Sequence, residues 1–330
     1  MNYKEEILKL KAKLDVTLVA HFYQKDEVFE LADITGDSLE LAKKSKESKS
    51  KFIVFCGVGF MGESVKILSP EKRVLMPKIA CCAMARMIDT AYFDDSLKIL
   101  NQNGIENSNI LPITYINSSA AVKARVGQMG GYVCTSSNAY KIIEKATEEK
   151  KKIFFVPDRC LGQNFAYKMG LKSAVIGKDE NLKDADILCY DGFCSVHQLF
   201  YPEDIDFYRK KYKDILIAVH PECDIEVCKK ADFVGSTSQL IKYIKELPKS
   251  QKVAVGTEFN MVNRLRDENT YILSQTKPEC PTMNETSLED VYNTLKIIER
   301  NETKILENEI LVDDDTRKWA FLALNRMFEV

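Results

Sequence analysis

Two hydrophobic patterns alternate along the chain. Short runs of apolar, often β-branched residues predict strands at 16–20, 52–56, 73–76, 110–115, 131–134, 152–156, 173–176, 186–190, 215–219, 232–235, 252–255 and 270–274. Between them, apolar residues at helical spacing predict helices at 2–13, 37–48, 61–68, 92–103, 118–126, 138–148, 160–169, 202–212, 224–230, 237–246, 259–267, 286–300 and 314–328. Strands that alternate with helices are typical of βαβ units. The pattern therefore predicts an α/β fold with parallel sheets.

Part of this pattern occurs three times. Three predicted strands end in a side chain that can exchange protons, and they are Val16–His21, Ile110–Tyr115 and Ile215–His220. The strands that follow them end in small polar residues, around Gly57, Ser136 and Ser236. We therefore expect three copies of one module, with the first copy one strand short. The alternative is that strands of any α/β protein end in Gly, Ser or Asp without a repeat.

The ends of the repeated strands carry polar residues that suit a binding site. Ligands of open parallel sheets bind beyond the carboxyl ends of strands, so three sheets facing one another would form one central cavity. The residues at these ends are His21, Tyr23, Tyr115, Asn117, Ser136, His220, Glu222, Ser236 and Thr237. In a cavity with little water, His21 beside Tyr23 and His220 beside Glu222 can act as general acids and bases. The alternative is that these groups are hydrogen-bonded structural residues.

Hydroxyl groups also stand at the predicted starts of three helices. Ser38, Ser136 and the pair Ser236–Thr237 each precede or open a helical stretch. Free N–H groups at a helix start bind phosphate or carboxylate. Ser and Thr are also ordinary N-caps, which need no ligand. The same arrangement in three modules favours an anion site.

The composition excludes several classes of protein. The chain has 330 residues, enough for two or three domains, and is 45% hydrophobic and 29% charged. A net charge of −2 argues against a nucleic-acid partner or a polybasic contact with a membrane. Residues 1–15 are charged and helix-like rather than a signal peptide. No apolar run approaches the roughly 18 residues of a membrane span. We therefore expect a cytoplasmic protein.

The chain has ten cysteines, and three of them form a pattern. There is no CxxC pair and no ferredoxin spacing, so a metal site would have to join cysteines that are far apart in sequence. Cys82, Cys194 and Cys280 each follow a strand after a turn rich in Gly or Pro, one in each module. One thiol per module indicates a metal centre shared by three modules. By contrast, residues inside apolar strands are expected in the core, and these are Cys56, Cys134 and Cys189.

Two kinds of metal centre fit three thiolates. An iron–sulfur cluster usually has four cysteine ligands, so a cluster held by three leaves one iron open. An open iron binds and polarises oxygen groups of a substrate as a Lewis acid. A catalytic zinc also keeps an open position and accepts thiolate ligands.

Many segments of the chain match those of a known family, in the family's order. They are Ala20–Gln24, Gly36–Ala42, Val54–Val58, Phe60–Leu68, Tyr115–Ser118, Thr135–Ala139, Pro157–Asp158, Leu161–Gly162, Gly192–His197, His220–Cys223, Gly235–Ser238, Gly256–Glu258 and Cys280–Met283. Through them the chain resembles the quinolinate synthases, iron–sulfur enzymes of de novo NAD biosynthesis. The resemblance runs from Val19 to about Leu295, which is nearly the whole chain.

The resemblance implies a fold and a cofactor. The fold is three similar three-layer αβα domains with parallel sheets around a pseudo-threefold axis. We place these domains at 1–92, 93–195 and 196–283, with the helices of 284–330 packing on the first. The cofactor is one [4Fe–4S] cluster, one ligand per domain, which corresponds to Cys82, Cys194 and Cys280. Cys81, next to the first ligand, is its alternative.

The resemblance also implies a reaction. Iminosuccinate, made from aspartate, condenses with dihydroxyacetone phosphate to give quinolinate, phosphate and water. The residues implied to contact the substrate are His21, Ser38, Tyr115, Asn117, Ser136, His220, Glu222, Ser236 and Thr237. Tyr23 and Glu222 are the implied proton-transfer residues, while His21 and His220 position carboxylate or carbonyl groups. A functional link to the enzyme that supplies iminosuccinate is expected, and a nucleic-acid or membrane partner is not.

Two other functions compete with this one. An iron–sulfur hydro-lyase acting on another small acid would use the same open iron but would leave the phosphate-binding hydroxyls without a role. An iron–sulfur sensor without catalysis would need a protein or DNA surface, and the sequence shows neither a basic patch nor a helix-turn-helix pattern.

Overall fold

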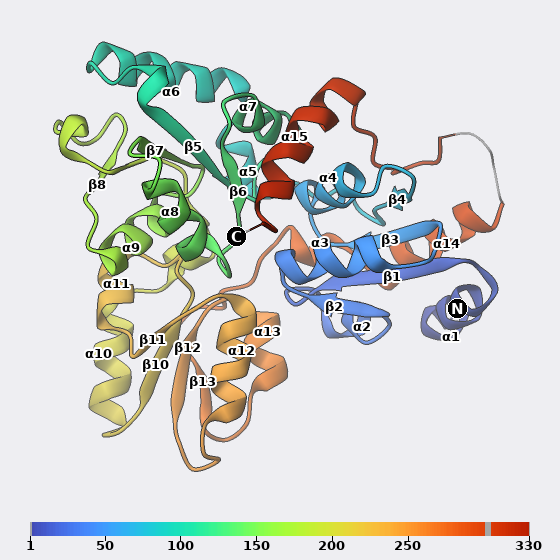
Figure 1. Cartoon of the computed structure of the whole chain (residues 1–330). Helices are drawn as coiled ribbons and strands as arrows, with labels where there is room; N and C mark the ends of the chain where they lie inside the picture. Colours follow the sequence, from blue (N-terminus) through green and yellow to red (C-terminus); the bar gives the residue numbers. More distant parts are fainter. Residues whose placement is uncertain (1, 301–304, 330) are drawn as a thin grey trace.

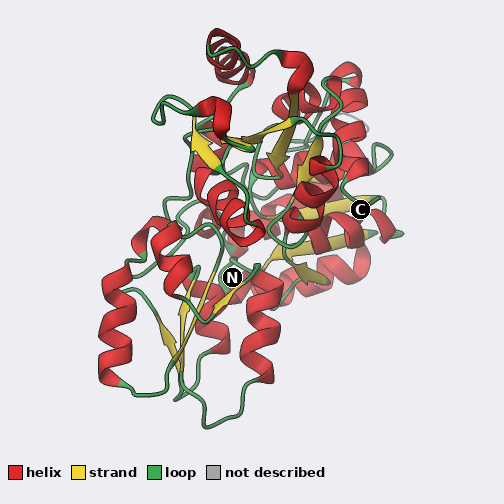
Figure 2. Cartoon of the chain, turned by 60° about the vertical axis from the view of Figure 1, so that its left-hand side comes forward, coloured by secondary structure: helices red, strands yellow, loops and turns green. Residues whose placement is uncertain are grey.

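The structure is a computed structural model that describes residues 2–300 and 305–329. Residues 1, 301–304 and 330 lie outside this description, and they belong to the predicted domain 1–92 and to the predicted helical region 284–330. The described residues form three parallel sheets (Figure 1). Figure 2 shows the strands between helices. The prediction of an α/β fold with three similar parallel-sheet units is confirmed.

The first sheet has the strand order β2-β1-β3-β4. Its strands are β1 (Val16–His21), β2 (Ile34–Gly36), β3 (Phe52–Cys56) and β4 (Arg73–Leu75). The helices around it are α1 (Tyr3–Lys13), α2 (Asp26–Phe29), α3 (Ser38–Glu47), α4 (Gly59–Leu68) and α5 (Ala83–Arg86). Every residue of β3 is buried, because a central parallel strand is covered on both faces.

The second sheet has the order β6-β5-β7-β9-β8. Its strands are β5 (Ile110–Tyr115), β6 (Tyr132–Cys134), β7 (Lys152–Val156), β8 (Ser173–Val175) and β9 (Ile187–Cys189). The helices are α6 (Thr90–Gln102), α7 (Ala120–Gln128), α8 (Ala139–Thr147) and α9 (Arg159–Met169), with short helices η1 (Asn107–Asn109), η2 (Leu182–Asp184) and η3 (His197–Leu199). The strand cysteines expected in the core are fully buried, and they are Cys56, Cys134 and Cys189.

The third sheet has the order β11-β10-β12-β13. Its strands are β10 (Leu216–Val219), β11 (Phe233–Val234), β12 (Val253–Gly256) and β13 (Thr270–Ile272). The helices are α10 (Pro202–Lys211), α11 (Ile225–Lys230), α12 (Thr237–Glu246) and α13 (Phe259–Leu265), followed by the short helix η4 (Met283–Glu285). The three sheets thus share one order of their first three strands, which supports the predicted repeat.

The prediction that the first copy lacks a strand is wrong. β2 pairs with β1 as β6 pairs with β5 and β11 with β10. This strand was missed because its three residues, Ile34–Gly36, are too few to show an alternating pattern. As a result, β3 corresponds to the third strand of the other copies, and the residue equivalent to Ser136 is Ser38 rather than one near Gly57.

Two further helices, α14 (Leu288–Glu299) and α15 (Asp314–Arg326), follow the third sheet. α14 packs against α1 and β3, and α15 packs against α7 and α4 (Figure 1). The approach of α15 to α7 is close, because a Cβ on Gly127 would lie 2.0 Å from the carbonyl oxygen of Trp319. The domain boundaries proposed above stay a prediction. No helix among the described residues is long and apolar enough to cross a membrane.

Candidate functional site

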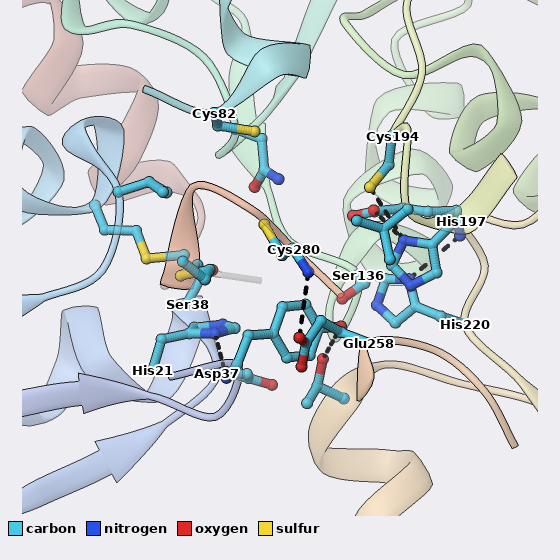
Figure 3. Close-up of a pocket in the computed structure, with 18 of the residues that line it drawn as sticks. His21, Asp37, Ser38, Cys82, Ser136, Cys194, His197, His220, Glu258 and Cys280 are labelled. Carbon is cyan, nitrogen blue, oxygen red and sulfur yellow. Dashed lines mark hydrogen bonds and ion pairs between the residues drawn. The ribbon is translucent and has the colours of Figure 1, made fainter. Parts of the chain in front are cut away.

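A cavity lies where the carboxyl ends of the three sheets meet (Figure 3). It holds about 640 Å³ of empty space. Of the predicted site residues, those that line it are His21, Tyr23, Ser38, Cys82, Tyr115, Asn117, Ser136, Cys194, His220, Glu222, Thr237 and Cys280. These residues are spread along the sequence from His21 to Cys280, and they meet at one place. This agrees with the rule that ligands of open parallel sheets bind beyond the carboxyl ends of the strands.

Two strand-end histidines are held as neutral rings. The backbone N–H of Tyr23 donates to Nδ1 of His21 at 3.1 Å, and the backbone N–H of Glu222 donates to Nδ1 of His220 at 3.3 Å. Burial lowers the pKa of His21 to about 4 and the pKa of His220 to about 3. With Nδ1 accepting, each neutral ring carries its proton on Nε2, where it can be donated to an oxygen of a ligand.

Glu222 is a buried carboxylate with two partners. Tyr115 Oη donates to Oε1 of Glu222 at 2.6 Å, and His197 Nδ1 lies 2.9 Å from Oε2. Burial by itself raises the pKa of the Glu222 carboxyl, but the neighbouring His197 and the Tyr115 hydroxyl hold that pKa below its usual value. The group is therefore ionised and can accept a proton.

A chain of hydrogen bonds joins Glu222 to Tyr23. Tyr23 Oη lies 3.0 Å from Thr257 Oγ1, which lies 3.0 Å from Nε2 of His197, whose Nδ1 contacts Glu222. Tyr23 Oη is also 3.0 Å from Thr237 Oγ1. Burial raises the pKa of the Tyr23 hydroxyl well above its usual value, so this hydroxyl keeps its proton. The two predicted proton-transfer residues are thus linked through His197 and a threonine.

At the starts of α3 and α12, the capping residue is followed directly by a residue that lines the cavity. α3 begins with a capping box in which the Asp37 side chain accepts from backbone N–H groups of its first turn. α12 begins in the same way with Ser236, which accepts from the backbone N–H of Gln239. Ser236 is buried and is not among the lining residues, unlike its neighbour Thr237. The equivalent residues Ser38, Ser136 and Thr237 all line the cavity.

Hydroxyl groups tie these helix starts together. Ser137 Oγ and Ser238 Oγ each donate to Oδ2 of Asp37 at 2.8 Å. Ser137 Oγ also lies 2.9 Å from Oγ of Ser236. Asp37 thus accepts from residues of the second and third modules while it caps a helix of the first module. These contacts fix three helix starts relative to one another.

The three predicted thiols meet in another part of the cavity. Figure 3 shows Cys82, Cys194 and Cys280 pointing into it from separate segments. Burial raises the pKa of Cys194 well above its usual value, and Glu222 and the thiols of Cys82 and Cys280 raise it further. Burial likewise raises the pKa of Cys82 to about 12. Without a cation these thiols keep their protons, whereas a bound metal favours the thiolate forms.

The donor set fits a metal centre with an open position. Cys81 is exposed and does not line the cavity, so Cys82 is the thiol that the first module presents. Among the residues that the structure describes, no fourth cysteine reaches the lining, and all ten cysteines are free. A second possible set of metal ligands is Cys194, His197 and Glu222, whose ligand atoms all lie within 4.8 Å of one another. That smaller group suits a single metal ion rather than a cluster.

The cavity lining contains acidic side chains, but among the described residues it contains no lysine or arginine. Its acidic residues are Asp37, Glu222 and Glu258. Burial raises the pKa of Glu258 to about 8, so this carboxyl is largely neutral near pH 7. Its oxygens accept from the backbone N–H groups of Met261 and Cys280. An anionic ligand here would be held by N–H and O–H groups.

Five polar residues of the lining were not predicted as site residues from the sequence, and they are Asp37, Thr135, His197, Glu258 and Thr282. His197 had no assigned role, although it follows Cys194 by one helical turn, and that spacing was the available signal. Asp37 opens the predicted helix 37–48, and Glu258 directly precedes the predicted helix 259–267. Cys160 and Cys223 are buried outside the lining.

Comparisons with known proteins agree with this arrangement. The family described as "Quinolinate synthetase A protein" matches residues 5–329. A protein named quinolinate synthase from Helicobacter pylori is 55% identical over 335 residues, covering 100% of this chain and 98% of its own length. Proteins of the same name from Geobacillus and Acidobacterium capsulatum are 41% and 39% identical, each covering 99% of this chain and 92% of its own length.

A family match and relatives of this identity extend over nearly all of the sequence and include every segment that lines the cavity. The chain therefore belongs to the quinolinate synthase family of NAD biosynthesis, and it is an enzyme.

Proposed function

We propose that the protein condenses iminosuccinate with dihydroxyacetone phosphate to give quinolinate, phosphate and two molecules of water. The four carbons and the nitrogen of the first substrate and the three carbons of the second account for the pyridine ring and its two carboxyl groups. The observation that carries the proposal is that three thiols from three modules and the starts of α3 and α12 line one cavity. The relatives that carry the name quinolinate synthase support it.

We assign the cofactor as one [4Fe–4S] cluster held by Cys82, Cys194 and Cys280. Three thiols without a fourth in the described lining suit a cluster with one open iron. When bound, the cluster supplies a Lewis acid that polarises oxygen groups of the substrate. His197 Nδ1 lies 3.2 Å from Cys194 Sγ, so this ring can hold the ligand side chain in place.

Binding of the two anionic substrates falls to uncharged groups. The caps Asp37 and Ser236 do not use the backbone N–H groups of Ser38 and Thr237. These N–H groups, with the hydroxyls of Ser38, Ser136 and Thr237, suit carboxylate and phosphate oxygens. Asn117 Oδ1 is buried and has no hydrogen-bond partner among the described residues. Such an acceptor needs a donor, and the imine N–H of iminosuccinate or a hydroxyl of the phosphate sugar provides one.

Proton transfer falls to Tyr23 and Glu222. Glu222 is ionised and can remove a proton from a carbon or hydroxyl of the substrate, whereas Tyr23 keeps its proton and can donate it. The chain through Thr257 and His197 lets the two exchange a proton between steps. His21 and His220, as neutral donors at Nε2, orient carbonyl or carboxylate oxygens.

The test is a direct assay. Anaerobically purified protein, incubated with iminosuccinate and dihydroxyacetone phosphate, is expected to form quinolinate and phosphate in equal amounts. Formation of neither product by protein that holds its metal centre contradicts the proposal. The link to an enzyme that oxidises aspartate to iminosuccinate is a further prediction, because the imine is hydrolysed readily and must be supplied nearby.

The second candidate is a hydro-lyase with a single metal ion. It is favoured by the group formed by Cys194, His197 and Glu222, whose ligand atoms suit zinc. Metal analysis separates the two: a colourless protein with one zinc and no iron supports this candidate and contradicts the cluster.

A further inference from the structure

The loop after β1 is held by an arginine from the third module. This loop runs from His21 to Gln24 and presents Tyr23 to the cavity. Arg264 Nη1 donates to the carbonyl oxygen of Gln24 at 2.8 Å, and Nη2 donates to the carbonyl oxygen of Phe22. Arg264 belongs to α13, which follows a strand of the third sheet.

The loop after β10 is held in the same way by an asparagine from the second module. This loop runs from His220 to Cys223 and presents Glu222 to the cavity. Asn164 Nδ2 donates to the carbonyl oxygens of Pro221 and Cys223, both at 2.8 Å. Asn164 is 7% exposed and belongs to α9, which follows a strand of the second sheet.

The two donors occupy equivalent positions in the repeat. α13 has Glu258 as its N-cap and α9 has Asp158, and each donor is the sixth residue after that cap. The carbonyls are equivalent too, since each pair belongs to the first and third residues after a strand-end histidine. The same contact is therefore made twice, each time from one module to the next, by side chains of different chemistry.

In the second module, the loop after β5 has no equivalent contact from a neighbouring module among the described residues. The equivalent position of α4 is Ser64, whose hydroxyl donates to Phe60 of its own helix at 2.7 Å. In the loop after β5 the carbonyl of Ser118 accepts instead from Lys123 of its own module, and the carbonyl of Ile116 accepts from the backbone N–H of Ser118 at 2.8 Å. Buried carbonyls need a donor, and this loop finds both donors locally.

In the loop after β1, the two hydrogen-bonded carbonyl groups belong to the residues on either side of Tyr23. In the loop after β10, they belong to the residues on either side of Glu222. We propose that Arg264 and Asn164 are positioning residues, which fix the two proton-transfer side chains from a neighbouring module. Holding carbonyls on both sides of a residue limits its backbone dihedrals and so the direction of its side chain. The proton-transfer roles of Tyr23 and Glu222 rest on the proposed function, whereas the hydrogen bonds that Arg264 and Asn164 make to the neighbouring modules do not.

Substitutions of Asn164 and Arg264 test this proposal. Asn164→Leu removes both donors at similar volume, and Arg264→Lys keeps the charge but has a single ammonium in place of the planar fork that reaches two carbonyls. Ser64→Ala is the matched control. Ser64 is the equivalent residue of the first module, and its hydroxyl bonds only to its own helix. Iron content and the thermal midpoint of each variant show that it folds.

Kinetics give the first readout. A misplacement of about 1 Å at a reacting group can cost on the order of 100-fold in rate. We expect kcat for quinolinate formation to fall roughly 10- to 100-fold in Asn164→Leu and Arg264→Lys, with KM changed by less than about 3-fold. Ser64→Ala is expected to retain wild-type kcat.

The histidine rings give a second readout that does not depend on the reaction. The chain has only three histidines, so the ring signals of His21 and His220 can be assigned in NMR spectra of the full-length protein with its metal centre. Asn164→Leu is expected to shift the His220 signals and leave those of His21, whereas Arg264→Lys does the reverse. Unshifted rings in both variants, or equal shifts of both rings in each, overturn the proposal. If Asn164→Leu does not fold, the Arg264→Lys pattern alone decides it.

Discussion

The thiol part and the helix-start part of the cavity handle charge in different ways. Cys82, Cys194 and Cys280 are buried thiols whose pKa values are raised, and they become good ligands only when a cation replaces their protons. Ser38 and Thr237, at the helix starts, offer hydroxyl and N–H groups that suit anions and need no change of protonation. We therefore propose that one part of the site depends on a metal and that the other is set by the fold alone.

This difference predicts that removing one thiol abolishes the metal centre. Cys280→Ala leaves only two thiols in the cavity, and we expect loss of the brown colour, of bound iron and of all quinolinate formation. Iron analysis and an absorption spectrum under anaerobic conditions measure this. Cys81→Ala is the control, since Cys81 is exposed outside the lining. Retention of a full complement of iron by Cys280→Ala shows that the ligand assignment is wrong.

Glu222→Gln separates chemistry from metal binding. The variant keeps the size of the side chain but cannot accept a proton, and we expect kcat to fall by about 10²- to 10⁴-fold. Its iron content is expected to match the wild type, because Glu222 contacts Tyr115 and His197 and is not one of the three thiols. A variant that keeps its iron and most of its activity would show that another group transfers the proton.

The helix-start part is expected to affect affinity rather than metal content. Thr237→Val removes a hydroxyl that lines the cavity without removing the cap of α12, which is Ser236. A hydrogen bond to a charged oxygen contributes about 1.5–3 kcal/mol, so KM is expected to rise at least roughly 10-fold with normal iron content. Ser236→Ala is expected instead to lower the free energy of unfolding by about 1 kcal/mol. An unchanged KM in Thr237→Val removes this residue from the binding site.

The smallest predicted effect is a pH dependence of stability from His21. Burial lowers its pKa to about 4 in the folded protein, against 6.5 as the ordinary value. The unfolded chain therefore binds this proton first, so stability is present above about pH 6.5 and is lost as the pH falls toward 4. Relative to His21→Asn, the wild type should lose about 0.8 kcal/mol between pH 7.5 and pH 6. Parallel stability curves for the two proteins in this range contradict a buried, neutral ring.

Much of this site could be predicted from local sequence. His21, Tyr115 and His220 each end an apolar run, and the direction of parallel strands is enough to place such residues at one edge. Cys82 could be preferred to Cys81 only through the family resemblance, and in the structure Cys82 lines the cavity while Cys81 is exposed.

Other features depend on contacts between modules and have no local signal. β2 was missed because three residues are too few to form a pattern. Ser236 looked like a lining residue, but its side chain turns back to cap α12 and contact Ser137. Asn164 and Arg264 are ordinary residues on helices, and their roles become visible only when the loops of neighbouring modules are placed beside them.

The most direct test of the shared metal centre is Mössbauer spectroscopy of anaerobically purified, iron-57-labelled protein with and without quinolinate. The account predicts about four irons and four sulfides per chain, and one iron site whose parameters change when the product binds. A single zinc, or four iron sites that all stay the same on binding, contradicts a cluster held by Cys82, Cys194 and Cys280 with one open corner.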